Sequence, residues 1–145
     1  MGLTVVSFLG LFTLFYLDNT KVVPAQGGEY TEGVVGYTRF INPLYSQNNE
    51  VDKDLVKLIY SGLVKRNSRG NIVLDLAKEY KLSDDEKTYT FTLRDDARWH
   101  DGKKISSDDV IFTINAIKDK NYNSSLYTSW KDITIQKIDN QTVQF

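Results

Sequence analysis

Few side chains in this sequence have the types and spacing that catalysis needs. His100 and Asp101 are adjacent, so the carboxylate could orient the imidazole for acid–base chemistry. They stand in the sequence Trp-His-Asp-Gly, however, where Asp-Gly is typical of a turn, and no serine or lysine nucleophile occurs in a recognisable motif nearby. We therefore interpret residues 99–102 as a turn and expect no catalytic residue and no enzymatic activity.

Pairs of carboxylates at residues 84–85, 95–96 and 108–109 could indicate a glycosidase or a calcium site. Each pair has a sufficient structural explanation as a turn or a helix cap, and none follows the alternating spacing of a calcium loop. The chain has no cysteine and a single histidine, which excludes thiolate and multi-histidine metal sites. A phosphate-binding glycine loop is also absent. We expect neither a metal nor a cofactor.

Two uncharged stretches, residues 45–49 and 126–130, combine amide and hydroxyl groups with aromatic rings. Such groups can pair with the polar atoms of a ligand, while the rings offer flat apolar walls. The alternative is ordinary loop chemistry with a tryptophan in the core. The candidate ligand-binding residues are Tyr45, Ser46, Gln47, Asn48, Tyr127 and Trp130.

Two helices are expected to position these stretches. Asn49 can cap the first, with Asp52 as the returning acidic partner, and apolar residues recur at helical spacing up to Leu63, which predicts one face in the core. Residues 106–109 supply a capping box for the second helix, which we expect to end near Lys118.

The strand signals are of different strength. Residues 88–94 alternate strictly, so Tyr89, Phe91 and Leu93 should point one way. A turn at 67–71 between short apolar pieces and a turn at 139–140 each predict a hairpin. A further strand is predicted over 30–37, where Gly33 and Gly36 suggest a kink or a close backbone approach. Together with the helices, these elements predict a mixed α/β fold.

Charge and hydropathy limit the function classes. The 18 Lys plus Arg and 19 Asp plus Glu give a net charge of -1, which argues against nucleic-acid binding. Residues 3–17 form an uncharged apolar run of roughly 22 Å as a helix, shorter than a bilayer core. We interpret residues 1–17 as a signal or membrane-anchor segment, with a buried soluble helix as the alternative. Residues 18–28 are then a linker, and 29–145 form the folded part.

The order of several motifs resembles the family 5 extracellular solute-binding proteins, the peptide- and nickel-binding receptors of ABC importers. The motifs are Gly-Gly-Glu-Tyr at 27–30, Ile-Asn-Pro-Leu at 41–44, Leu-Ile-Tyr-Ser-Gly-Leu at 58–63, Asp-Leu-Ala-Lys at 75–78, Leu-Ser-Asp-Asp at 82–85, Tyr-Thr-Phe-Thr-Leu-Arg at 89–94, Trp-His-Asp-Gly-Lys at 99–103 and Ser-Asp-Asp-Val-Ile-Phe at 107–112. The resemblance implies the N-terminal part of lobe I of a two-lobed, periplasmic-binding-protein-like receptor of type II, class C. It also implies an extracytoplasmic location, a peptide ligand and ABC permease subunits as partners.

By the same resemblance, Tyr45, Ser46, Gln47 and Asn48 match a family segment that lies along the ligand, and Tyr127 and Trp130 fall in a region that reaches the cleft. The sequence departs from the family in lacking the lipid-modified cysteine and in being several times shorter than the family's chains. Its membrane contact would therefore be the apolar helix. Two alternatives stay open: a membrane-tethered sensory or adhesion domain, and a secreted hydrolase.

Overall fold

The computed structural model describes residues 27–29 and 31–145. The predicted signal or anchor segment 1–17 lies outside the described residues, as does the linker 18–28 apart from Gly27 and Gly28. The chain divides after Gly33 into two units, and the account below concerns residues 34–145. Across the described part of the chain, no helix has the length and hydropathy needed to cross a membrane.

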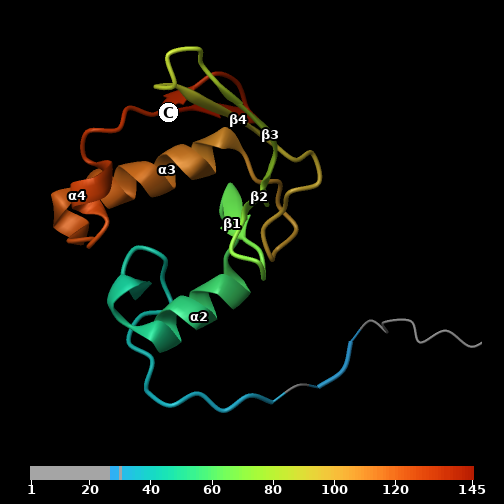
Figure 1. Cartoon of the computed structure of the whole chain (residues 1–145), viewed down its shortest axis with the longest axis vertical. Helices are drawn as coiled ribbons and strands as arrows, with labels where there is room; N and C mark the ends of the chain where they lie inside the picture. The colour runs from blue at the N-terminus through green and yellow to red at the C-terminus, as the bar shows by residue number, and fades with distance from the viewer. Residues whose placement is uncertain (1–26, 30) are drawn as a thin grey trace, which may run out of the picture. The chain divides into compact units, whose positions relative to one another are not determined.

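Residues 34–145 form a mixed α/β arrangement, as the sequence predicts (Figure 1). In chain order its elements are η1 (Ser46–Asn48), α2 (Glu50–Ile59), β1 (Val64–Arg66), β2 (Ile72–Leu74), β3 (Ala77–Leu82), β4 (Tyr89–Leu93), α3 (Ser107–Lys118), η2 (Lys120–Tyr122), α4 (Tyr127–Trp130), β5 (Gln136–Lys137) and β6 (Thr142–Gln144).

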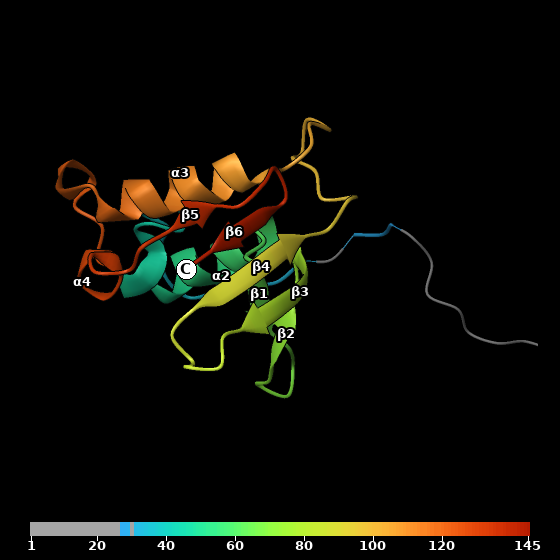
Figure 2. The ribbon, with the colours of Figure 1, turned by 90° about the horizontal axis from the view of Figure 1, so that it is seen from above.

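The strands form two antiparallel sheets. The larger sheet has the order β3-β4-β6-β5, and its register places Phe91 of β4 between Tyr80 of β3 and Val143 of β6. Helix α3 packs beside β5 and β6, as Figure 2 shows. The pair β1–β2 joins Val64 to Leu74, which confirms the hairpin predicted around the turn at 67–71.

The core lies where β4 meets the chain that leads into α3. Leu93 is completely buried and packs with Ala97 and Ile105. The predicted alternation of β4 is confirmed in direction, since the rings of Tyr89 and Phe91 stack on the same side of the sheet at 6.5 Å. Only Leu93 reaches full burial, however, because Phe91 is half-buried and Tyr89 is 41% exposed.

The strand predicted over 30–37 is wrong, because residues 31–41 contain no strand. Within residues 34–41 the chain is bonded to the start of α2: the side-chain amide of Asn49 donates to the carbonyl of Tyr37 at 3.0 Å. Gly36 does make the close approach that its position suggests, because a Cβ there would lie 2.8 Å from Cγ2 of Val51. Its φ of +139° also favours glycine.

Helix α2 begins as predicted, with the side-chain oxygen of Asn49 accepting from the amides of Val51 and Asp52. Asp52 does not return to Asn49, whose amide donates instead to the carbonyl of Ser46 at 3.2 Å. The expectation that one face of this helix is core is also wrong for its last turn. Leu58 is 83% exposed and Ile59 is 41% exposed, because nothing in residues 34–145 covers them.

The second half of the fold follows the sequence signals closely. Ser106 and Asp109 form the capping box of α3, which ends at Lys118 as expected. The predicted turn at 99–102 is confirmed by a hydrogen bond of 2.9 Å from the amide of Gly102 to the carbonyl of Trp99. The C-terminal hairpin forms as β5 and β6, and the hydroxyl of Ser107 donates to the carbonyl of Asp139 in its turn at 2.6 Å.

We expect Leu93→Ala to lower the free energy of unfolding by about 2–5 kcal/mol, because it opens a cavity in the buried core. Leu58→Ala removes the same atoms from an exposed site and should change that free energy by no more than about 0.5 kcal/mol. Denaturant midpoints of the two variants provide the measurement. Equal midpoints would contradict the placement of the core.

Candidate functional site

The two polar-aromatic stretches lie side by side, although 80 residues separate the groups that join them. The hydroxyl of Ser124 donates to the carbonyl of Leu44 at 2.8 Å, and Ser124 is only 6% exposed. We call residues 42–48 the Asn42 loop and residues 124–130 the α4 segment. Sequence reasoning missed Ser124, since a lone serine gives no sign of a partner so far along the chain.

The Asn42 loop folds through its first residue. The side chain of Asn42 accepts from the amide of Leu44 at 2.9 Å, and its carbonyl accepts from the amides of Tyr45 and Ser46. This Asx turn leads directly into η1. Within the loop Ser46 is buried, Gln47 and Asn48 are exposed, and half-buried Tyr45 lies with its ring centroid 5.5 Å from that of Phe40. The two exposed side chains offer carbonyl acceptors and amide donors to solvent.

The α4 segment begins after a left-handed residue, Asn123, with φ of 49°, which ends η2 and redirects the chain. Tyr127 and Trp130 are both partly buried. The Nζ of Lys120 lies 5.8 Å from the centroid of the Tyr127 ring. Trp130 packs edge-on against Phe145, with centroids 6.0 Å apart.

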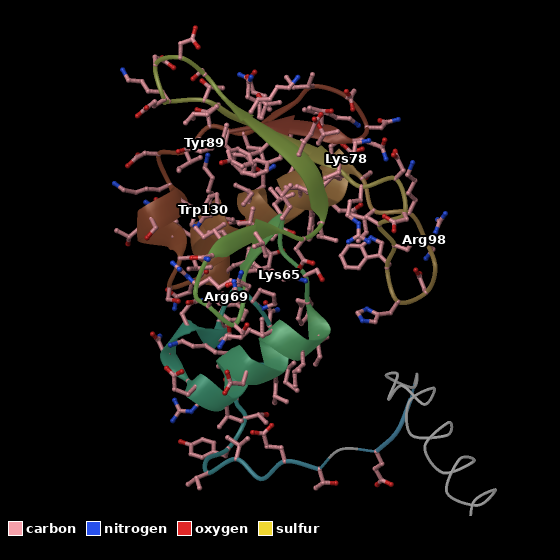
Figure 3. All side chains as sticks on the ribbon, turned by 45° about the vertical axis from the view of Figure 1, so that its right-hand side comes forward. Lys65, Arg69, Lys78, Tyr89, Arg98 and Trp130 are labelled. Atoms are coloured by element: carbon pink, nitrogen blue, oxygen red, sulfur yellow. The ribbon has the colours of Figure 1, made fainter. Side chains whose placement is uncertain are left out.

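A cavity of about 1010 Å³ adjoins this junction. Of the six candidate residues, only Trp130 lines it, whereas the first half of the Asn42 loop, at 42–44, contributes another part of the wall. In Figure 3, Trp130 and Arg98, which both line the cavity, lie on opposite sides of the view. The other five candidates belong to the same two stretches of chain but do not line the cavity. They are Tyr45, Ser46, Gln47, Asn48 and Tyr127.

Aromatic rings form a continuous wall of this cavity. Phe145 meets Phe91 edge-on at 5.8 Å and Trp130 edge-on at 6.0 Å, so three rings connect β4 to α4. Tyr89 stacks on Phe91 and also lines the cavity. Such a wall suits apolar groups. The alternation of β4 could have revealed Tyr89 and Phe91, but not the contact that Phe145 makes with both Phe91 and Trp130.

Charged side chains also line the cavity, among them Arg98 and Asp109. The guanidinium of Arg39 donates to the hydroxyl of Tyr37 at 2.6 Å, and this hydrogen bond raises the pKa of Arg39 above its ordinary value. Over residues 27–29 and 31–145, no three His, Asp or Glu side chains gather closely enough to hold a metal ion. The arrangement therefore offers hydrogen-bonding groups and aromatic faces that suit the binding of a molecule.

Comparison with known proteins identifies relatives of this chain. The family model described as "Bacterial extracellular solute-binding proteins, family 5 Middle" matches residues 71–145. The oligopeptide-binding protein AppA of Bacillus subtilis (strain 168) is 33% identical over 99 residues, which cover 68% of this chain and 18% of that protein.

Solved structures agree with this match. NikZ from Campylobacter jejuni in complex with Ni(L-His) has a TM-score of 0.68 at 36% identity, covering 75% of this chain and 22% of that one. AppA from Bacillus subtilis in complex with a nonapeptide has a TM-score of 0.71 at 27% identity, covering 77% of this chain and 22% of that one. The chain thus spans about a fifth of the length of these relatives.

We expect Ser124→Ala to lower the free energy of unfolding by about 1 kcal/mol, because it removes the partly buried hydrogen bond to the carbonyl of Leu44. The control is Ser125→Ala, which removes the same hydroxyl from an exposed neighbour. Denaturant melts give the free energies, and amide chemical shifts of residues 44–48 should move only in Ser124→Ala. Identical spectra for the two variants would show that the junction does not depend on Ser124.

Proposed function

Because this chain belongs to the bacterial extracellular solute-binding proteins of family 5, we propose that it is part of the substrate-binding component of an ABC importer and that its ligand is a peptide. The observation that carries the proposal is the junction of the Asn42 loop and the α4 segment through Ser124 and Leu44. It brings together the two stretches whose chemistry suits a peptide. The names of the relatives, an oligopeptide-binding protein and a structure holding a nonapeptide, support the same ligand class.

The proposed division of labour follows from exposure. Gln47 and Asn48 stand in solvent and can pair with the amide and carbonyl groups of a peptide backbone. Aromatic surface for the side chains of the peptide comes from Tyr45, Tyr127 and Trp130. Buried Ser46 supports the turn at Asn42 from inside the fold. The relatives are named as binding proteins, which supports the proposal that the ligand is bound and released unchanged.

We further propose that the complete receptor has two lobes that close on the ligand, of which this chain supplies one wall. Since the chain spans about a fifth of its relatives, most of the surface that would bury a peptide lies elsewhere. The entropic cost of association is the same for half a site as for a whole one, whereas the buried surface is smaller. We therefore expect millimolar binding by the chain alone.

A titration followed by two-dimensional NMR tests the ligand class. The whole chain, labelled with nitrogen-15, is titrated with a nonapeptide and, separately, with the nickel–L-histidine complex, each up to about 10 mM, where binding weaker than about -4 kcal/mol is still detected. We expect the peptide to shift the amides of residues 44–48 and 126–130. Gln47→Ala should weaken the peptide response at least threefold, whereas Gln136→Ala, a matched change on exposed β5, should not.

Each other outcome of the titration has a definite meaning. A response to the nickel complex alone would replace the peptide as the ligand. Shifts confined to other residues would place the site elsewhere, and no response to either ligand would favour a sensory or adhesion domain that binds a protein. Hydrolysis of the nonapeptide during the experiment would favour the alternative that the protein is a secreted hydrolase.

The location of the protein is a second part of the proposal. We propose that residues 3–17 direct the chain to the membrane and that the folded unit lies outside the cytoplasm, either tethered or secreted. Support comes from the uncharged apolar run and from the family, whose description is extracellular.

Protease added to intact cells tests this location. We expect the folded unit to be degraded, or to be found in the medium or periplasm, while a cytoplasmic marker protein stays intact. Lysed cells provide the control that the protease cleaves both proteins. A chain that is protected in intact cells and is recovered with the cytoplasmic fraction would contradict the proposed location.

A further inference from the structure

Asp52 is a buried carboxylate with an unusual set of partners. It lies in the first turn of α2, is only 1% exposed, and uses both of its oxygens. Oδ1 accepts from the amide of Arg39 at 2.9 Å, and Oδ2 accepts from the amide of Phe40 at 3.0 Å. The other carboxylates of this helix, Glu50 and Asp54, stand in solvent and pair with lysines one turn on.

Helix capping does not explain this arrangement. Asn49 already accepts from the amides of Val51 and Asp52, so α2 has its cap without the Asp52 carboxylate. Burying a carboxylate is costly unless hydrogen bonds to its charged form compensate, and bonds of that kind are stronger than neutral ones. The two amides at Arg39 and Phe40 supply this compensation, so the irregular chain and the helix hold each other in place.

The two hydrogen bonds of Asp52, which we call the Asp52 clamp, lie directly before the Asn42 loop. Two further bonds run between α2 and this stretch: Asn49 to the carbonyl of Tyr37 at 3.0 Å, and the hydroxyl of Tyr60, just past the helix end, to the carbonyl of Ile41 at 3.3 Å. Both of these bonds are exposed to water, whereas the two Asp52 bonds are partly buried. On its other side the loop is held by Ser124. The path of the loop is thus fixed at its entrance by one buried carboxylate.

We propose that Asp52 is a positioning residue for ligand binding, which fixes the entrance of the Asn42 loop so that Gln47 and Asn48 meet the ligand. This inference rests on the proposed function, in that it takes the loop to contact the peptide. Asp52 itself is buried and touches no ligand.

The test compares Asp52→Asn with Asp54→Asn in the whole chain. Both changes remove one negative charge from α2, but Asp54 is exposed and bonded only to Lys57. An asparagine at 52 keeps one acceptor and turns an NH₂ group toward a backbone N–H. We expect Asp52→Asn to weaken nonapeptide binding in the NMR titration at least tenfold at a temperature where the chain stays folded. Amides 39–48 should also exchange faster with deuterium, while those of α3 and β4 stay unchanged.

The control should bind as the parent chain does and keep its exchange pattern. A purely structural role would lower the melting temperature of Asp52→Asn without changing the affinity of its folded form, and that result would overturn the proposal. If the parent chain itself binds no peptide, the proposed function fails, and this is visible before any variant is made.

Exchange in the parent chain decides the matter if Asp52→Asn does not fold. The proposal requires that the amides of Arg39 and Phe40 be protected to the same degree as those inside α2. Exchange of these two amides at the rate of an unfolded peptide would show that the clamp does not hold in solution and would overturn the proposal.

Discussion

Backbone N–H and C=O groups outside helices and strands need hydrogen-bond partners. In this fold, buried side chains supply them at three places where distant segments meet, which we call joints. Asp52 binds amides 12 and 13 residues away, Ser107 a carbonyl 32 residues away, and Ser124 a carbonyl 80 residues away. Each joint connects an irregular segment to a helix or its approach. Because an unpaired buried polar group is costly, these three residues help to fix the relative positions of the segments, together with the small apolar core around Leu93.

The elements that can be predicted from the sequence are those with local signals. The cap at Asn49, the capping box at Ser106 and the turns of both hairpins depend on residues within a few positions of each other. The strand expected over 30–37 fails because β-forming residues need a partner strand, and the helix beside them supplies hydrogen bonds instead. The prediction that Asp52 returns to Asn49 is wrong for a similar reason, because the distant amides of Arg39 and Phe40 bind its carboxylate instead.

The candidate site likewise combines features that the sequence predicts with features that only the folded chain shows. Resemblance to a family points to the Asn42 loop and the α4 segment as stretches of chain, and the bond between Ser124 and Leu44 brings them together. The cavity beside them has an aromatic wall drawn from β4, α4 and the last residue, Phe145. No sequence pattern relates these rings, because they come from segments that only the folded sheet makes neighbours.

The long separation between Ser124 and Leu44 has a consequence for the order of folding. The β3–β4 hairpin closes a short stretch of chain, whereas the Ser124 bond closes 80 residues, and the entropy lost in closing a loop grows with its length. We therefore expect the Asn42 loop to join the α4 segment only after the hairpins have formed.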